Sequence, residues 1–268
     1  MEFTAEEIKK IISSKISEVG TEIVIYDEVE STNSLAYELI KKGYPSGTVV
    51  IADRQTKGKG RLGRKWISPE GKNLYMSIAI KPNITPKYAT LITLTSAVAC
   101  TTALRRYAEI PVIIKWPNDM LVDHKKVGGI LTEMKIEGER IKAVVVGIGI
   151  NVNMAEDDIP EEIKEIATSL RICKGEEFSR AMLASEIIKE FDKWYQLLEK
   201  KNRKTIIDRW MQLSGTIGKQ VKIVLTDREI RAVAEAIDEE GRLIVRLPDG
   251  TYEKISAGDV TLLRDKEC

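Results

Sequence analysis

The segment between Arg54 and Asn73 shows neither helical nor strand periodicity, although alternating apolar residues predict strands on both sides of it. A structureless stretch of about twenty residues inside a compact domain is uncommon, and is usually either functional or disordered. Up to Pro69 it carries no acid, and its three glycines allow the backbone to approach a ligand closely. Its six cations are Arg54, Lys57, Lys59, Arg61, Arg64 and Lys65. We expect a cradle for an anion, built from backbone N–H groups and guanidinium forks.

A solvated basic surface is the alternative for this loop, but Trp66 within it favours a ligand site. The spacing Gly58-x-Gly60-x-x-Gly63 matches the dinucleotide fingerprint, yet Ser-Pro-Glu-Gly at 68–71 follows where that motif needs a helix. A Walker loop is excluded because Arg-Lys, rather than Lys-Ser or Lys-Thr, follows the last glycine. The protein-kinase pattern lacks its later lysine strand and catalytic loop. The loop therefore indicates a phosphate or carboxylate ligand without naming a standard nucleotide fold.

The composition is that of an ordinary globular protein, with 43% hydrophobic and 31% charged residues among 268. Lys and Arg number 42 against 41 Asp and Glu, so the net charge argues neither for nor against a polyanionic partner. Cys100, Cys173 and Cys268 are far apart, which excludes a zinc spacing and fits a reducing compartment. The first nineteen residues lack an apolar signal core, and the longest apolar run, 143–150, is too short to span a bilayer. We expect a soluble cytoplasmic protein with no membrane partner.

Apolar periodicity and turn residues predict alternating strands and helices up to residue 213. Thr4 and Glu7 form a capping box that opens a helix running to about Val19. After Gly215, five short alternating runs separated by turn residues indicate a small β-barrel. We expect one domain over 1–214 and a second over 215–268. In the first, strands are predicted at 22–29, 48–53, 74–81, 112–116, 120–122, 126–136 and 141–150, the last two as a hairpin, and helices at 31–43, 85–108, 178–200 and 203–213.

Four further segments combine polar or cationic residues with turns or glycines. In 115–119, Lys115 can neutralise a phosphate and the side-chain oxygens of residues 118 and 119 suit Mg²⁺, although Pro-Asn-Asp is equally the chemistry of a β-turn. Residues 126–131 and 147–153 place glycines inside apolar strands, which indicates close backbone approach by a ligand or, alternatively, tight sheet packing. Residues 30–34 offer small hydroxyl and amide groups that bind a polar head or cap a helix.

In their order and spacing, these segments resemble the catalytic domain of the biotin protein ligases, and the C-terminal strands resemble the small domain of that family. The resemblance covers essentially residues 24–263. It implies an α+β fold: a class II synthetase-like catalytic domain, with a mixed or antiparallel sheet flanked by helices, followed by a small SH3-like β-barrel. It also implies the reaction, in which biotin and ATP give biotinyl-5′-adenylate and pyrophosphate, and a C–N bond then joins biotin to a lysine of a biotin carboxyl carrier protein. ATP, Mg²⁺ and a possible homodimer are implied as well.

The resemblance further implies roles for individual residues. Two of them, Arg61 and Lys126, are the catalytic contacts to the biotin carboxylate and the α-phosphate. The biotin pocket is completed by Ser31, Thr32, Asn33, Gln55, Lys59, Gly60, Gly128, Gly129 and Gly149. The ATP side consists of Arg61, Arg64, Trp66 stacked on adenine, Lys115, Asn118 and Asn151, with Asn118 and Asp119 as metal ligands. Lys59 stands where many members carry arginine, and a lysine lacks the bidentate fork.

Two alternative functions are weighed against this one. Lipoate ligases and octanoyl transferases share the fold in outline, but their glycine-rich segment carries a His-Asp pair that this chain lacks. A nucleic-acid-binding regulator would use the basic loop and the barrel; the near-zero net charge and an N-terminal segment too short for a winged helix argue against it, so we expect no nucleic-acid partner. The one histidine, His124, is predicted in a turn and is a poor candidate for a catalytic base. The loop is expected to be disordered when empty, because like charges repel.

Overall fold

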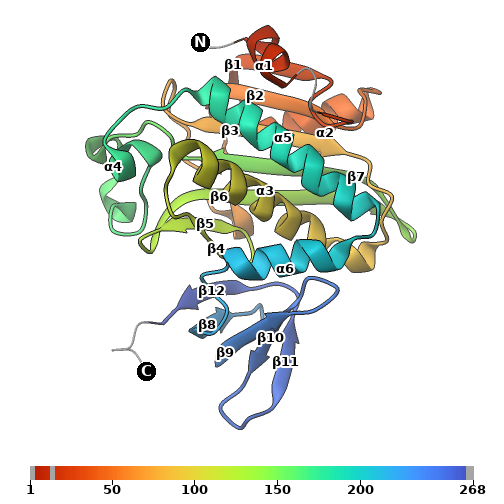
Figure 1. Ribbon diagram of the computed structural model, residues 1–268, viewed down its shortest axis with the longest axis vertical. Helices are drawn as coiled ribbons and strands as arrows, with labels where there is room; N and C mark the ends of the chain where they lie inside the picture. Colours follow the sequence, from red (N-terminus) through yellow and green to blue (C-terminus); the bar gives the residue numbers. More distant parts are fainter. Residues whose placement is uncertain (1–3, 13–15, 264–268) are drawn as a thin grey trace.

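The computed structural model describes residues 4–12 and 16–263 of the chain. Its larger part is built on a seven-stranded sheet with the order β1-β2-β3-β7-β6-β5-β4 (Figure 1). β1 and β2 run parallel, and the other neighbouring strands are antiparallel, which confirms the mixed sheet and the predicted hairpin. The strands are β1 (Ile23–Val29), β2 (Thr48–Gln55), β3 (Leu74–Ile80), β4 (Ile113–Lys115), β5 (Asp119–Val122), β6 (Lys125–Glu137) and β7 (Arg140–Ile150).

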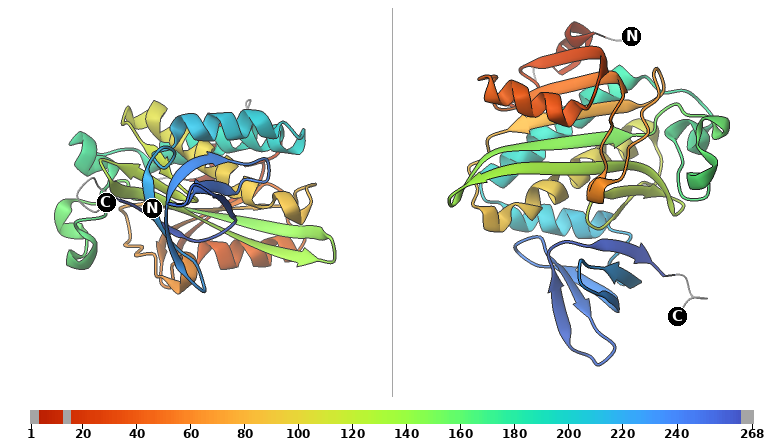
Figure 2. Two further views of the ribbon diagram at one scale, coloured as in Figure 1. Left: turned by 90° about the horizontal axis from the view of Figure 1, so that it is seen from below. Right: turned by 180° about the vertical axis from the view of Figure 1, so that it is seen from behind.

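Helices cover both faces of this sheet, and strand alternation decides which residues meet them. On β2, Val49 and Ile51 face the main core, which α3, α5 and α6 share, whereas Val50 faces α2 on the other side. Figure 2 shows α2 on the face opposite to α3 and α5. The helices are α1 (Ala5–Ile12), α2 (Thr32–Lys41), α3 (Thr90–Ala108), α4 (Leu170–Lys174), α5 (Arg180–Glu199) and α6 (Arg203–Leu213), with short 3-10 turns at Arg61–Gly63, Pro86–Tyr88, Glu156–Asp158 and Glu161–Ile163.

The N-terminal helix is shorter than its sequence predicts. The capping box forms, since Glu7 N–H donates to Thr4 Oγ1 at 3.2 Å and Thr4 N–H donates to Glu7 Oε2 at 2.8 Å. α1 nevertheless ends at Ile12, and residues 16–19 are not helical. The backbone N–H groups of residues 17, 18 and 19 donate to the buried carboxylate of Asp192 on α5 instead. The prediction of a helix to Val19 is wrong because this distant carboxylate binds the N–H groups that a helix would use.

The C-terminal part forms a second sheet below α6 (Figure 1). Its five strands are antiparallel in the order β11-β10-β9-β8-β12, which confirms the five predicted strands. Two hydrogen bonds tie the connecting segment to the larger part: Gly215 N–H donates to Ile114 O at 2.9 Å, and Trp116 N–H donates to Thr216 Oγ1 at 2.9 Å. In the described ranges, no helix combines the length and the apolar character needed to cross a membrane. The strands are β8 (Gln220–Val224), β9 (Glu229–Ile237), β10 (Leu243–Arg246), β11 (Tyr252–Ile255) and β12 (Asp259–Leu262).

Candidate active site

A cavity of about 1150 Å³ lies between the α2 face of the main sheet and the C-terminal sheet. Both parts of the chain contribute to its wall, the smaller one through residues 215, 218–220 and 259–263. Every site residue predicted from the sequence lines this cavity, with the exception of Gly128. The predicted residues in the wall are Ser31, Thr32, Asn33, Gln55, Lys59, Gly60, Arg61, Arg64, Trp66, Lys115, Asn118, Asp119, Lys126, Gly129, Gly149 and Asn151.

Gly128 lies under the cavity floor, because neighbouring residues of a strand point to opposite faces of a sheet. A Cβ atom at this position would lie 2.7 Å from Ile150 Cδ1 and 2.8 Å from Met120 Cε, both of which belong to buried core side chains. Tight packing in the core therefore explains this glycine. The assignment of Gly128 to the biotin pocket is corrected accordingly.

The glycines that face the cavity make room for side chains of the protein itself. At Gly147 a Cβ would lie 2.1 Å from Asn33 Oδ1, and at Gly149 it would lie 2.5 Å from Trp66 Cε2. Gly129 is the strand partner of Gly149, and a Cβ added to it would lie 3.4 Å from Trp66 Cζ3, another atom of the same indole ring. The sequence pattern indicates close approach by a ligand or, alternatively, tight packing. The space directly above these glycines is occupied by Asn33 and Trp66 instead.

One end of the cavity is a network of mostly uncharged side chains, of which Thr32, Asn33 and Ser77 are buried. Thr32 donates to Gln55 Oε1 through its backbone N–H at 2.9 Å and through Oγ1 at 3.1 Å. Ser77 Oγ lies 2.8 Å from Thr32 Oγ1 and donates to Asn33 Oδ1 at 2.7 Å. Asn33 Nδ2 in turn donates to Glu133 Oε2 at 2.7 Å. This end offers both donors and acceptors to a small polar ligand.

The loop that follows β2 folds into a short hairpin over the cavity. Lys59 and Lys65 pair across it, and Trp66 N–H donates to Gly58 O at 2.9 Å. The tip is the 3-10 turn Arg61–Gly63, in which Leu62 has a positive φ of 54° and an exposed side chain. The hairpin turns Arg61 and Trp66 toward the cavity, where both line the wall.

Not all the loop cations belong to the site. Arg54 pairs with Glu28 at 3.0 Å and Lys57 pairs with Glu30 at 2.7 Å, and none of these four residues lines the cavity. Among the described residues that do line it, seven carry lysine or arginine side chains and two carry carboxylates. This excess of positive charge at one end makes the cavity a site for an anionic group.

Arg61 reaches from the loop tip to both parts of the chain. Its Nη1 donates to Asn118 Oδ1 at 3.0 Å, and its Nη2 donates to the Gly258 carbonyl at 3.2 Å. Burial lowers the pKa of Arg61, while Asp119 and Asp259 oppose that change; an arginine pKa is so high that the side chain stays charged at neutral pH. The loop is also linked to the C-terminal sheet by an ion pair between Arg64 and Asp259.

Asp119 holds two of the cavity's lysines. Its carboxylate lies 2.5 Å from Lys126 Nζ and 3.2 Å from Lys115 Nζ. Burial raises the pKa of Asp119, but the attraction of Lys126 and then of Lys115 outweighs it, so the pKa lies below its usual value. The carboxylate is therefore ionised at neutral pH and positions both ammonium groups at the cavity wall.

Trp66 separates the cationic end from an apolar slot. Lys126 Nζ lies 5.4 Å from the centroid of the indole, within the range of a cation–π contact. The indole Nε1 is buried without a hydrogen-bond partner among the described residues. Met154, Ile159 and Ile163 line the same cavity with apolar surface.

Several residues of the site were missed in the sequence. Ser77 interrupts an otherwise apolar strand, and Met154 and Ile159 are apolar residues in an acidic stretch, so both signals were present. Asp259 carried no local signal, because its role depends on Arg64, a residue far away in the chain. His124 lies in the turn between β5 and β6, as predicted.

Comparison with known proteins places this cavity in a family. Residues 26–151 match the Biotin/lipoate A/B protein ligase family, and residues 216–263 match the Biotin protein ligase C terminal domain. The Bifunctional ligase/repressor BirA of Bacillus spizizenii is 38% identical over 248 residues, which cover 92% of this chain and 76% of that protein. A Biotin--[acetyl-CoA-carboxylase] ligase of Mycobacterium tuberculosis is 30% identical, with 89% of each chain covered.

A solved structure is similar over the same range. The biotin protein ligase from Aquifex aeolicus in complex with biotin and ATP superposes with a TM-score of 0.78 and is 33% identical. The match covers 91% of this chain and 100% of that one, so it includes the C-terminal sheet as well as the main one.

Proposed function

This chain belongs to the biotin protein ligase family and is a ligase that joins biotin to protein, and from that premise we propose how its cavity divides the reaction among its residues. The observation that carries the proposal is the separation, within one cavity, of an uncharged hydrogen-bonding end from a cationic end. The ureido ring of biotin binds at the uncharged end, to Thr32, Asn33 and Gln55, with Ser31 beside them. Its carboxylate then points toward Arg61 and Lys126.

ATP takes the other half of the cavity. Its phosphates bind among the cations at the loop and at Lys115, and Asn118 and Asn151 line this half as well. The adenine ring enters between Trp66 and the apolar slot that begins at Met154, since an aromatic face and apolar side chains suit a purine. The indole is already supported from below by two glycines, which favours stacking in a fixed plane.

In the first step, a carboxylate oxygen of biotin attacks the α-phosphorus of ATP, a new O–P bond forms, and pyrophosphate leaves. The carboxylate is ionised at neutral pH, so no general base is needed. The barrier arises mainly from bringing two anions together, and preorganised positive charge lowers it. Arg61 and Lys126 supply this charge where the two substrates meet.

In the second step, the neutral amine of a carrier lysine attacks the biotinyl carbonyl carbon, a C–N bond forms, the C–O bond to the phosphate breaks so that AMP leaves, and the nitrogen releases a proton to water. The same two cations stabilise the negative charge that develops on the carbonyl oxygen. A smaller cavity of about 270 Å³ shares Arg61 and Asn118 with the larger one and opens between α3 and β6. We assign the entry of the acceptor lysine to this second opening, because the larger cavity is filled by the adenylate at that stage.

Biotin-dependent exchange of labelled pyrophosphate into ATP tests the first step. We expect exchange with biotin and only background exchange with lipoate or octanoate. Transfer of labelled biotin to a biotin carboxyl carrier domain tests the second step. Exchange that depends on lipoate rather than biotin would contradict the proposal, and it would favour the related lipoate ligases.

The side chains of Asn118 and Asp119 are not suited to bind a magnesium ion together. The Asp119 carboxylate is bound by two lysines, and the Asn118 amide accepts from Arg61 and donates to the Ile130 carbonyl at 2.7 Å. Among the described residues there is no cluster of three or more His, Cys, Asp or Glu side chains suited to a metal. We therefore derive no step from a metal ion bound by these side chains.

The proposal extends to the setting of the enzyme. We propose a cytoplasmic protein without a nucleic-acid partner, supported by sparse cysteines and a net charge of +1. Binding to DNA with a steep salt dependence would contradict the absence of a nucleic-acid partner.

The assembly and the domain division are also part of the proposal. Exposed Met134 and Ile136 on the β6–β7 hairpin support self-association as a homodimer, which sedimentation of the wild-type protein and of Ile136→Glu tests. The change from α6 to the short strands supports a division into domains at 1–214 and 215–268, which limited proteolysis tests.

A further inference from the structure

A buried ion pair lies beside the active-site loop but outside the cavity. Asp53 on β2 is 7% exposed, and Arg180, the first residue of α5, is 2% exposed. Arg180 Nη1 donates to Asp53 Oδ1 at 2.5 Å. Burying two charges costs free energy that their attraction often fails to recover, and a cation in the first turn of a helix opposes the helix dipole. Such a pair is a poor way to gain stability, which points to another role.

The pair sits at the base of the loop, where β2 and β3 part. These two strands are paired only as far as Ala52 and Tyr75, while β2 stays paired with β1 up to Gln55, after which the loop begins. Asp53 stands at the departing end, and its Oδ1 also accepts from Gly71 N–H of the returning end at 3.3 Å. Arg180 Nη1 donates to the Asn73 carbonyl, at the returning end, at 3.3 Å. The ion pair therefore binds both ends of the loop at once.

From this neck, one set of bonds continues to the cavity wall. Asn73 Oδ1 accepts from Val152 N–H at 2.9 Å, and Asn73 Nδ2 lies 2.9 Å from Met154 Sδ. Met154 lines the apolar slot, and on the other side Gln55, two residues after Asp53, lines the polar end. The neck is thus linked to both halves of the cavity.

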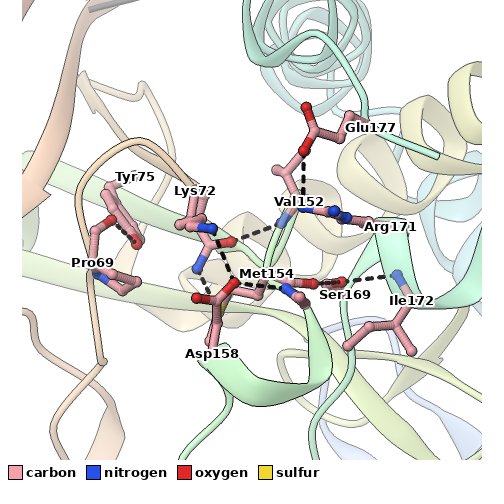
Figure 3. A network of polar contacts seen from close by, with 12 residues as sticks. Pro69, Lys72, Tyr75, Val152, Met154, Asp158, Ser169, Arg171, Ile172 and Glu177 are labelled. Carbon is pink, nitrogen blue, oxygen red and sulfur yellow. Dashed lines mark hydrogen bonds and ion pairs between the residues drawn. The ribbon is translucent and has the colours of Figure 1, made fainter. Parts of the chain in front are cut away.

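Figure 3 shows the surrounding contacts, which join the returning end of the loop to the segments after β7. Lys72 Nζ lies 3.1 Å from Asp158 Oδ2, and Ser169 Oγ donates to the Met154 carbonyl at 2.6 Å. Tyr75 Oη on β3 donates to the carbonyl of Pro69 in the loop at 3.0 Å. The segment that returns from the loop and the wall of the apolar slot are therefore held as one unit.

We propose that Asp53 and Arg180 are positioning residues: they fix the neck of the loop, and so set where Arg61 and Trp66 meet the two substrates. The inference rests on the proposed roles of those two loop residues. Neither Asp53 nor Arg180 lines the cavity, so their effect on the reaction runs through the loop geometry. A displacement of about 1 Å at a reacting group can cost about 100-fold in rate.

The test is the double variant Asp53→Leu/Arg180→Met, since apolar residues of similar volume often replace a buried ion pair without loss of stability. We expect a folded protein whose kcat/KM for biotin-dependent exchange is about 100-fold lower. The KM values for biotin and ATP rise, and biotin with ATP no longer protects the loop from proteolysis. A purely structural role would change the fraction of folded protein, and would leave the KM values and the protection as they are.

The matched control is Arg106→Met, which removes the ion pairs of Arg106 on α3 with Glu186 and Glu190 of α5, away from the loop. We expect a modest loss of thermal stability and wild-type KM values. If the double variant does not fold, Arg180→Lys is used instead, because lysine keeps the positive charge but lacks the bidentate guanidinium group. For this variant we expect KM values raised about tenfold. Wild-type KM values and protection in either folded variant would overturn the proposal. Absence of exchange in the wild-type protein would instead contradict the proposed function.

Discussion

The two ends of the cavity differ in how their side chains are held. At the proposed biotin end, Thr32 and Asn33 are 4% and 5% exposed, and their side chains are already bound to neighbours. At the proposed phosphate end, the Lys126 side chain is 34% exposed, and a protein carboxylate, Asp119, holds it. One end is thus a fixed polar network, and the other is a group of cations paired with an anion of the protein.

This difference has a physical reason. A buried polar network discriminates well because each group that a wrong ligand leaves unsatisfied costs free energy. Cations that bind a doubly or triply charged ligand would repel one another in the empty site. Asp119 and Asp259 reduce that repulsion, and a phosphate can take over their role. Substitutions at the two ends should therefore differ in size and in kind.

The largest effect is expected for Lys126→Ala at the phosphate end. The variant removes charge that acts on the developing transition state, so the rate of biotin-dependent exchange should fall about 10²- to 10³-fold. The control is Lys125→Ala, since Lys125 donates to the Lys164 carbonyl and does not line the cavity. A loss of less than tenfold for Lys126→Ala would remove this residue from the catalytic pair.

Asn33→Ala probes the fixed network at the biotin end. Ser77 keeps its bond to Thr32 and Glu133 is exposed, so the loss falls on the ligand group that Asn33 would bind, at a cost of about 1–3 kcal/mol. We expect the KM for biotin to rise about 10- to 100-fold, with a smaller change in the KM for ATP. Steady-state kinetics with each substrate varied measures this, with the exposed Asn83→Ala as control. Equal changes in both KM values would argue against two separate ends.

Gly149→Ala acts at the border between the ends. Its Cβ would lie 2.5 Å from the indole of Trp66, so the ring must move. We expect the KM for ATP to rise about tenfold, from the loss of a stacking contact worth roughly 1 kcal/mol and some further disorder. The double variant Gly149→Ala/Trp66→Ala should be no worse than Trp66→Ala alone. Additive losses would show that Gly149 acts by some route other than the indole.

The smallest effect concerns acid stability at the phosphate end. Because the pKa of Asp119 is lowered in the folded state, its ion pairs stabilise the fold above about pH 4, and this contribution is lost as the pH falls through the folded value. Asp119→Asn should therefore melt a few degrees below wild type at pH 7, with the difference shrinking toward pH 3. Thermal melts across this range measure it. A constant difference would contradict the assignment.

Much of the fold follows from local patterns. The β6–β7 hairpin and the five C-terminal strands are visible as alternating residues between turns, because each pairing involves neighbours in the chain. The residues of the cavity could be collected from motifs, since each motif supplies its own side chain to the wall. The sequence also predicts Arg54 in the anion cradle, which the structure does not bear out. Glu28 on β1 lies beside Arg54 in the sheet and pairs with it, and this pairing joins two separate segments, so the sequence does not indicate it.

What escaped prediction depends on partners far away in the chain. The end of α1 is decided by Asp192, and the need for Gly147 is decided by Asn33, more than a hundred residues earlier. Strand alternation would have placed Gly128 and Gly129 on opposite faces, but it could not say which face holds the cavity. The apolar slot at Met154 is marked only by single apolar residues in an acidic stretch, and without periodicity these do not indicate that they share one wall.

The Gly258 carbonyl and Asp259, at the start of β12, have a consequence for the newly made protein. Ribosomes deliver β12 after every other strand of the described chain, so the loop carries its cations long before Arg61 and Arg64 find these two partners. A partly synthesised chain also lacks residues 259–263 of the cavity wall. The cavity wall and the contacts of the loop cations are therefore complete only after β12 has been made.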